Sequence, residues 1–295
     1  MITTASVPGT CGELFQGTLD GEPCLVSCPI SVSSSARAGV GVRVGPLPVK
    51  VRRALEAVAI PPDRMPHVEL TRRLPLGRGY GTSTADLGAA VHAVARAAGR
   101  PVDDAEAVRI AVAVEPSDST LLAGIALLDH RAGRFHRSLG EPPEATVLIL
   151  DPGGRVDTVA FNAVDFRRVL ARLAGVHREA FDRLEQGVRE RDLAAIGAAA
   201  TLSAVAHQAV LPSPLLEPAI ELARRFGAVG VCRAHSGTIV GILLPPDGED
   251  GGRIAQLRAA LPVRVGVRRA SLVGGGPRIA VEPVPVPPAC AEEVA

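Results

Sequence analysis

Apolar and polar residues alternate along much of the N-terminal half of the chain, a pattern that indicates β-strands. The stretch 2–7 alternates, 24–28 is short and apolar, and 31–44 is rich in Ser and Val. We expect a strand in each of them, with a turn-rich hairpin connection over 17–23. Further strands are expected over 67–72, 125–130, 135–139 and 146–150.

Helical periodicity and helix-ending residues mark the next elements. The clearest is 82–98, an Ala-rich stretch that Gly99 follows in the position of a C-cap glycine. Asp103 or Asp104 is expected to cap a second helix that runs to about Val114. Other helices are expected over 50–58, 165–189, 192–210, 215–226 and 252–260, and other strands over 229–234, 239–244, 263–267 and 278–281.

The order of these elements bears on the fold class. Strands and helices are mixed without strict alternation, which favours an α+β fold over a doubly wound sheet. A chain of 295 residues is long enough for two modest domains. Because the second half is richer in helix, we expect an N-terminal domain over 1–161 and a C-terminal domain over 162–295. The tail from Glu282 is rich in Pro and Val and is expected to be extended.

Composition narrows the class of protein further. Hydrophobic residues make up 47%, charged residues 21%, and the net charge is +1, without the basic excess typical of nucleic-acid-binding proteins. There is no leader-like N-terminus, no long apolar run and no paired cysteine framework, so we expect a cytoplasmic protein without a membrane partner. Lys50 is the only lysine. Because no motif described below adjoins it, no catalytic lysine is expected.

The segment that precedes the helix over 82–98 carries the strongest chemical pattern. Glycine occupies every second position before three consecutive hydroxyl side chains, in the order Pro75, Leu76, Gly77, Arg78, Gly79, Tyr80, Gly81, Thr82, Ser83 and Thr84. Glycines allow a backbone to approach a ligand closely, and a helix N-terminus attracts anions such as phosphate. The segment lacks the lysine of a P-loop and the context of a dinucleotide-binding turn. Taken alone, it also fits a glycine loop with an ordinary Ser/Thr helix cap.

Three further segments bear on the interpretation of this loop, and one of them, 115–120, supplies two carboxylates and three hydroxyls in six residues. Residues 7–14 read VPGTCGEL, 115–120 read EPSDST, and 230–238 read GVCRAHSGT. Together with the glycine loop and in this order, they resemble the motifs of the GHMP kinases, a superfamily named for galactose, homoserine, mevalonate and phosphomevalonate kinases. Within it, the phrases PGTCGELFQG, CLVSCPI, GTSTAD, EPSDST, LLDHRAG and AHSGT resemble the L-threonine kinases of cobalamin biosynthesis.

The resemblance implies a two-domain α+β architecture, with an N-terminal part like ribosomal protein S5 domain 2 and a ferredoxin-like C-terminal part. ATP and substrate would meet between them. The implied reaction is ATP-dependent phosphorylation of the side-chain hydroxyl of L-threonine, which gives O-phospho-L-threonine for the aminopropanol linker of cobalamin. A GHMP kinase for another small alcohol, such as homoserine, and a ligand-binding protein of this fold without catalysis are alternatives. A homodimer is left open.

The resemblance also implies residue roles. Phosphoryl transfer needs charge neutralisation by a metal and a group that orients the nucleophile. Ser83, with Thr82 beside it, and Glu115 are the expected Mg²⁺ ligands, and Asp118 is expected to accept the proton of the substrate hydroxyl. The reverse roles for Glu115 and Asp118 stay open, because the spacing is shorter than in the family. The ATP phosphates are assigned to the loop 75–84.

Several expected substrate contacts come from the other segments. They are Glu13, Cys28, Ser119, His235, Ser236 and Gly237. A surface role for Glu13 and plain turn chemistry for His235 and Ser236 are alternatives. Asp129 and His130 are expected to end a strand and to be structural. Family members often place a Lys or Arg near the N-terminal motif, but none occurs between Met1 and Ser35, so that cationic helper is in doubt.

Overall fold

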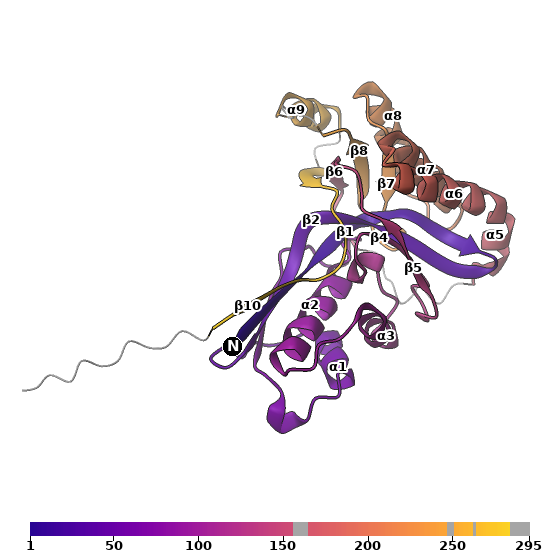
Figure 1. The fold of residues 1–295 in the computed structure, drawn as a ribbon. Coiled ribbons are helices and arrows are strands. Elements are labelled where there is room, and N and C mark those ends of the chain that lie inside the picture. Colours follow the sequence, from indigo (N-terminus) through magenta and orange to yellow (C-terminus); the bar gives the residue numbers. More distant parts are fainter. Residues whose placement is uncertain (156–164, 247–250, 262–263, 284–295) are drawn as a thin grey trace, which may run out of the picture.

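One antiparallel sheet with flanking helices forms the framework of the molecule (Figure 1). The computed structural model describes residues 1–155, 165–246, 251–261 and 264–283. The strands follow the spatial order β5-β4-β2-β1-β7-β8-β6-β9, with β3 paired to β2 and β10 paired to β1. Their bounds are β1 Ile2–Leu19, β2 Glu22–Gly39, β3 Val68–Thr71, β4 Ile125–Leu128, β5 His136–Gly140, β6 Thr146–Asp151, β7 Gly230–Arg233, β8 Val240–Leu244, β9 Gly266–Ser271 and β10 Arg278–Glu282.

Most of the helices lie in two groups along the long β1–β2 hairpin (Figure 1). Helices α1 to α3 gather at one end of the hairpin, and α6 to α8 gather near β7. Among the described helices, none is both long and apolar enough to cross a bilayer. Their bounds are α1 Val49–Ala57, α2 Thr82–Ala97, α3 Asp104–Val114, α5 Arg167–Arg172, α6 Ala174–Glu190, α7 Leu193–Ala206, α8 Leu216–Arg225 and α9 Gly251–Ala260, with short 3₁₀ turns at η1 Pro62–Arg64, η2 Ser119–Leu121 and η3 His207–Ala209.

The β1–β2 hairpin is longer than the sequence pattern predicted. Asp20 and Gly21 both have positive φ, at 53° and 83°, as a two-residue turn between twisted strands requires. The predicted connection over 17–23 was therefore too wide, and the separate strands over 24–28 and 31–44 are one strand that ends at Gly39. Most positions of both strands are buried, so the polar alternation that marks a half-exposed strand is weak.

Local capping signals placed two helices correctly. Helix α2 begins at Thr82 and ends at Ala97, followed by Gly99 with a φ of 75°. Asp103 caps α3, because its side chain accepts the backbone N–H of Glu106 at 2.7 Å. The single helix expected over 165–189 is instead two helices, α5 and α6, which are separated at Leu173.

Pairing between distant segments joins the two halves of the chain. Strand β6 lies between β8 and β9 and pairs antiparallel with both, and β10 returns to pair with β1. The strand expected over 263–267 is shifted to β9, and the expected boundary near Asn162 lies outside the described residues. The α+β class is confirmed, while the division into domains over 1–161 and 162–295 stays a proposal.

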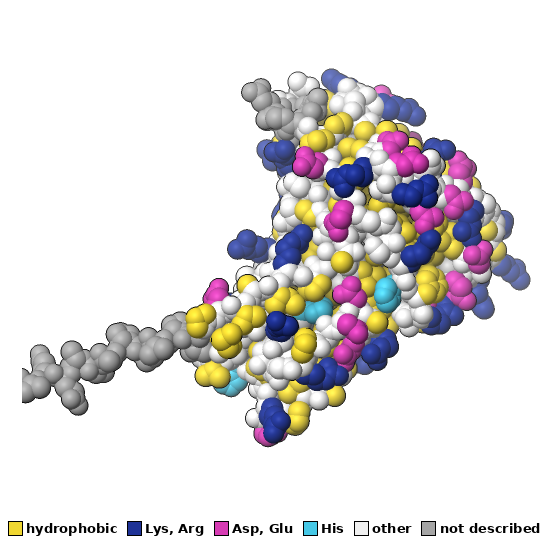
Figure 2. All heavy atoms as spheres, in the orientation of Figure 1, with side chains coloured by type: hydrophobic (Ala, Val, Ile, Leu, Met, Phe, Trp, Pro, Cys, Tyr) yellow, Lys and Arg dark blue, Asp and Glu magenta, His cyan; other side chains and the backbone are white. Residues whose placement is uncertain are grey.

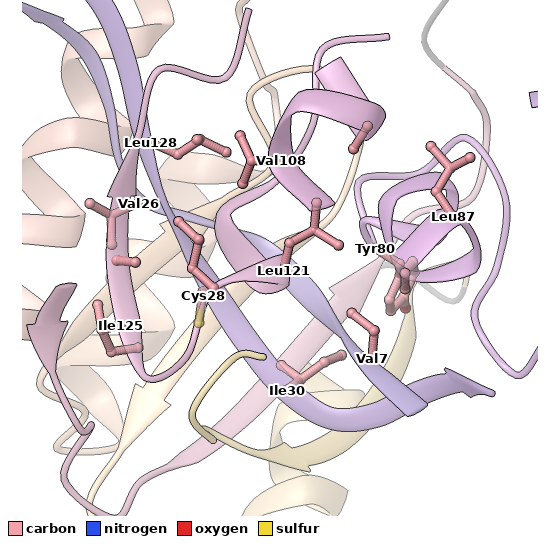
Figure 3. Packing of buried hydrophobic residues seen from close by; sticks show 14 of the residues in the cluster. Val7, Val26, Cys28, Ile30, Tyr80, Leu87, Val108, Leu121, Ile125 and Leu128 are labelled. Carbon is pink, nitrogen blue, oxygen red and sulfur yellow. The ribbon is translucent and has the colours of Figure 1, made fainter. Parts of the chain in front are cut away.

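A dense apolar cluster fixes α2 on the hairpin (Figure 3). Gly88 of α2 faces this cluster, and a Cβ there would lie 2.4 Å from Leu121 and 3.1 Å from Val7. The helix thus sits flat against β1 and the 3₁₀ turn η2. Because η2 follows directly on Asp118, this packing positions the acidic segment 115–120 beside the start of α2.

Candidate active site

The glycine loop is held on both sides by backbone hydrogen bonds. The N–H of Thr10 donates to the carbonyl of Tyr80 at 2.9 Å, and the N–H of Thr238 donates to the carbonyl of Arg78 at 2.9 Å. The side chains of Arg78 and Tyr80 both donate to Asp151 at the end of β6, at 3.0 and 3.1 Å. The loop therefore connects the N-terminal segment 7–14, the segment 230–238 and the sheet.

The three glycines of the loop all have left-handed backbone conformations. Their φ angles are 70° at Gly77, 98° at Gly79 and 63° at Gly81. A Cβ on Gly79 would lie 2.1 Å from Cβ of Ala234, and one on Gly81 would lie 2.9 Å from Oδ2 of Asp118. Glycine is thus required here by φ and by the close approach of neighbouring protein segments.

The acidic segment 115–120 meets the first turn of α2. The hydroxyl of Ser83 donates to Glu115 Oε1, and the backbone N–H of Asp118 donates to Thr84 Oγ1 at 3.0 Å. These contacts connect residues more than thirty positions apart in the chain. The structure thereby brings together the expected metal ligands, Ser83 and Glu115, and places the expected base, Asp118, next to them.

A cavity of ≈ 430 Å³ opens in front of this junction. Its volume is in the range typical of small-ligand sites. Segments 7–14, 75–84, 115–120 and 230–238 all contribute to its wall. The predicted site residues that line it are Glu13, Gly77, Gly79, Tyr80, Gly81, Thr82, Ser83, Thr84, Glu115, Asp118 and Ser236.

The remaining residues of the loop prediction stand behind the cavity wall. The carbonyl of Pro75 accepts the Thr82 hydroxyl at 2.6 Å, which fixes the loop to the helix start. Arg78 turns its guanidinium to Asp151. Neither Pro75 nor Arg78 is part of the lining. The contacts of these two residues stabilise the conformation of the loop.

Two of the expected substrate contacts are built into the hairpin. Ser119 and Ser27 exchange hydrogen bonds, each backbone N–H donating to the other's hydroxyl, at 2.9 and 3.0 Å. Cys28 is fully buried, and its N–H donates to Thr10 Oγ1 at 2.9 Å. Neither side chain lines the cavity. The four described cysteines, Cys28 among them, are buried free thiols.

His235 and Gly237 also lie outside the lining. The His235 ring is fully buried and stacks on His207, with ring centroids 3.9 Å apart. Its backbone N–H donates to Glu13 Oε2 at 2.9 Å, so His235 holds a cavity residue through its main chain. A Cβ on Gly237 would lie 2.4 Å from the carbonyl oxygen of Arg78. From this segment, Ser236 reaches the cavity.

Burial shapes the charge of the two central carboxylates. It raises the pKa of Asp118 to about 6, a shift that a hydrogen bond with Thr84 opposes and the charge of Glu115 increases. Burial also raises the pKa of Glu13 well above its ordinary value, together with the charge of Asp118 and against the hydrogen bond from His235. Both carboxylates would gain from a cationic or proton-donating ligand.

A lysine contacts the site, contrary to the expectation from sequence. Lys50, in the first turn of α1, lines the cavity and forms an ion pair with Glu115. The expectation was wrong because it considered only neighbours along the chain, and the two residues are 65 positions apart. The one signal in the sequence was composition: Lys50 is the only lysine in a chain whose other fixed positive charges are arginines.

Three more basic lining residues were missed. Arg72 donates from Nε to Asp86 at 2.8 Å, and Asp86 also accepts the Ser34 hydroxyl at 2.6 Å, so α2 holds a guanidinium at the cavity. His130 and Arg131 line it from the turn after β4. The LLDHRAG phrase contained the signal for these two residues, of which His130 had been interpreted as structural.

Comparisons with known proteins agree with this geometry. Residues 48–125 match the family described as GHMP kinases N terminal domain, and residues 184–262 match GHMP kinases C terminal. The chain is 28% identical over 270 residues to an L-threonine kinase of Salmonella typhimurium (strain LT2), covering 88% of each chain. It is 28% identical over 262 residues to an L-threonine kinase of Citrobacter freundii, covering 84% of this chain and 88% of that protein.

A solved structure supports the fold. Homoserine kinase from Cytophaga hutchinsonii superimposes with a TM-score of 0.63 and 18% identity, covering 95% of this chain and 97% of that chain. The family matches define the class as a small-molecule kinase. The site agrees with it, because a glycine-rich helix start lies beside a hydroxyl–carboxylate pair and further carboxylates in one cavity. The chain belongs to the GHMP kinases, whose two domains match more than half of its length, and these enzymes use ATP.

Proposed function

We propose that this enzyme transfers the γ-phosphoryl group of ATP to the side-chain hydroxyl of L-threonine, giving ADP and O-phospho-L-threonine. The two curated L-threonine kinases that match most of the chain support this substrate. The observation that carries the proposal is the convergence of Glu13, Glu115 and Asp118 on one cavity beside the start of α2. The product would serve the aminopropanol linker of cobalamin.

The phosphates of ATP lie at the N-terminus of α2 in this proposal. Three successive hydroxyl residues stand there with the free N–H groups of the first turn. Lys50 and Arg72 add positive charge from α1 and from the segment after β3. Both are held by carboxylates, which orients them without removing their charge.

Ser83 and Glu115 fit a Mg²⁺ ion. They offer adjacent hard oxygen atoms, and Glu115 already accepts a cation, the Lys50 ammonium group. Bound there with ATP, Mg²⁺ would neutralise negative charge on the phosphate oxygens. Lys50 then becomes free to turn from Glu115 to the phosphates.

Asp118 orients the substrate. Its carboxylate accepts the hydrogen of the threonine hydroxyl, whose oxygen attacks the γ-phosphorus as the bond to the β–γ bridging oxygen breaks. A pKa of about 6 makes Asp118 more basic than an ordinary aspartate and still ionised at neutral pH. Glu13, held by the N–H of His235, accepts the ammonium group of threonine.

A coupled ADP-release assay across L-threonine, L-serine, L-homoserine and 1-amino-2-propanol tests the proposal. We expect the highest kcat/KM with L-threonine and no ADP release with excess EDTA. A clear preference for homoserine would reject L-threonine as the substrate while retaining the kinase reaction.

A further inference from the structure

We propose that Arg131, supported by His130, binds the α-carboxylate of the substrate and makes the enzyme selective for free amino acids over neutral analogues. This inference rests on the proposed function, because it assumes that a hydroxy amino acid occupies the cavity. It assigns a substrate-binding role to the turn that follows β4.

The pairing of positive charges in the cavity singles out Arg131. Lys50, Arg72 and Arg131 are the basic residues other than histidine in the cavity lining of the described chain. Lys50 is paired with Glu115, and Arg72 with Asp86. The guanidinium of Arg131 has no hydrogen-bond or ion-pair partner among the described residues, and only its backbone N–H is engaged, by Asp129 at 3.3 Å. Arg131 is thus the fork-shaped cation left for a ligand carboxylate.

His130 supplies a second and independent observation. It lines the cavity, it is only 6% exposed, and its Nδ1 is buried without a hydrogen-bond partner in the described structure. Burial and the charge of Arg131 lower its pKa to about 4, so the ring is neutral at physiological pH. A buried polar atom without a partner is costly unless a ligand or water satisfies it. His130 is also fixed to the acidic segment, because its carbonyl accepts the N–H of Ser117 at 2.9 Å.

The cavity lining places this turn in the same site as the amine-binding carboxylate Glu13. On β2, Ser27 is paired with Glu13 of β1, and Leu25 is paired with Leu128 of β4. Ser27 and Leu25 are two positions apart, so they lie on the same face of β2. Strands β1 and β4 therefore flank β2, two strand spacings of about 4.8 Å apart. Glu13 of β1 and the turn after β4 reach one cavity.

This arrangement matches a zwitterion. The carboxylates Glu13 and Asp118 would receive the ammonium group and the hydroxyl, and Arg131 would receive the carboxylate. A substrate without a charged carboxylate would leave the guanidinium without its partner. Recognition of an α-amino acid thus needs residues from three places in the fold: β1, the turn after β4 and the segment after α3.

L-Threonine and L-threoninamide, which differ in the charge of one group, provide the test. In the wild-type enzyme we expect a KM about 10- to 100-fold lower for L-threonine, as one charge-assisted pair provides. Arg131→Met should raise the KM for L-threonine by about the same factor and leave the KM values for L-threoninamide and ATP unchanged. Arg131→Lys should give an intermediate KM, because a point charge replaces a fork. Arg109→Met, at an exposed position of α3, is the matched control.

Two results would overturn the inference: an unchanged KM for L-threonine in Arg131→Met, or a rise in the KM for ATP alone, which would assign Arg131 to the phosphates.

If the enzyme phosphorylates homoserine and not threonine, the proposed function fails. The same comparison with homoserine and its amide then decides the role of Arg131. Calorimetric titration of wild type with each amino acid shows whether any hydroxy amino acid binds; binding of none would reject both proposals.

Discussion

At the scale of single residues, Asp118 combines burial with access to the cavity. Its backbone N–H is fixed to Thr84, and Gly81 leaves space for its carboxylate. Burial raises its pKa to about 6. The same burial that makes the carboxylate a better proton acceptor therefore makes its ionised form less stable in the folded protein.

Asp118→Asn should lower turnover roughly 10²-fold or more, the usual contribution of a positioned acid–base group, with ATP and threonine still bound. In the wild type, activity should fall as pH drops below about 6, because Asp118 becomes protonated. Steady-state rates from pH 5 to 8 measure both effects. Near-normal turnover in the variant would contradict the role; a changed metal requirement with little loss of rate would exchange the roles of Asp118 and Glu115.

The raised pKa of Asp118 also predicts a stability effect. The folded state holds a proton on Asp118 up to about pH 6, whereas an unfolded aspartate releases it near pH 3.8. Stability from this group is therefore full below about pH 4 and is lost as pH rises through 6. Asp118→Asn should raise the free energy of unfolding at pH 8 by up to about 3 kcal/mol and change it little at pH 4. Urea unfolding at both pH values checks this, and a variant less stable than wild type at pH 8 would contradict it.

Lys50 is also a matter of single residues. A purely structural role and a role in ATP binding predict different effects of replacing it on stability and on kinetics. Its ion pair with Glu115 is half exposed on the lysine side, so Lys50→Met should change the free energy of unfolding by less than about 1 kcal/mol. If Lys50 contacts the phosphates, kcat/KM for ATP should fall about 10-fold or more. Arg52→Met on α1 is the control. Equal kinetics in the two variants would show that Lys50 has no role with ATP.

At the scale of elements, the loop before α2 is held in a fixed conformation by its neighbours. Both backbone angle and lack of space require glycine in it. Their backbone angles exclude most other residues, and Gly79 is in contact with Ala234. The loop is also tied to Asp151 by two side chains. Its conformation is thus set before any ligand arrives, as an anion site at a helix start requires.

Two glycines of similar φ separate backbone strain from crowding. Gly79 has a φ of 98° and a Cβ would meet Ala234 at 2.1 Å, whereas Gly99 has a φ of 75° and nothing lies within 4 Å. Gly99→Ala should cost about 1 kcal/mol, and Gly79→Ala about 2–4 kcal/mol, because overpacking is added. Urea unfolding of both variants measures the difference. Equal losses would mean that the loop can move away from Ala234.

The same elements show how far the sequence could predict the molecule. Asp103 and Gly99 placed helix ends because capping is a local interaction. The length of the hairpin was missed because both of its strands are buried along most of their length. The pairing of β6 between β8 and β9, and the contact of Lys50 with Glu115, depend on tertiary packing between distant segments. Local patterns carry no information on either.

At the scale of the whole molecule, the β1–β2 hairpin connects both helix groups and carries one wall of the site. Glu13 lies on β1, where it pairs across to Arg233 of β7, and Phe15 packs on Phe181 of α6. Basic and acidic side chains are interspersed over the face that carries α6, α7 and α8 (Figure 2). The cavity thus depends on segments from all three thirds of the chain, held by one sheet.

The position of the transferred phosphoryl group tests the central claim most directly. After incubation of the enzyme with ATP, Mg²⁺ and L-threonine, ³¹P NMR distinguishes an ester on the hydroxyl from an acyl phosphate on the carboxylate. With the hydroxyl at Asp118 and the carboxylate directed away from the phosphates, we predict a phosphomonoester signal split by the β-proton of threonine, strongly reduced with Asp118→Asn. An acyl phosphate, or inorganic phosphate as the sole product beside ADP, would contradict the account.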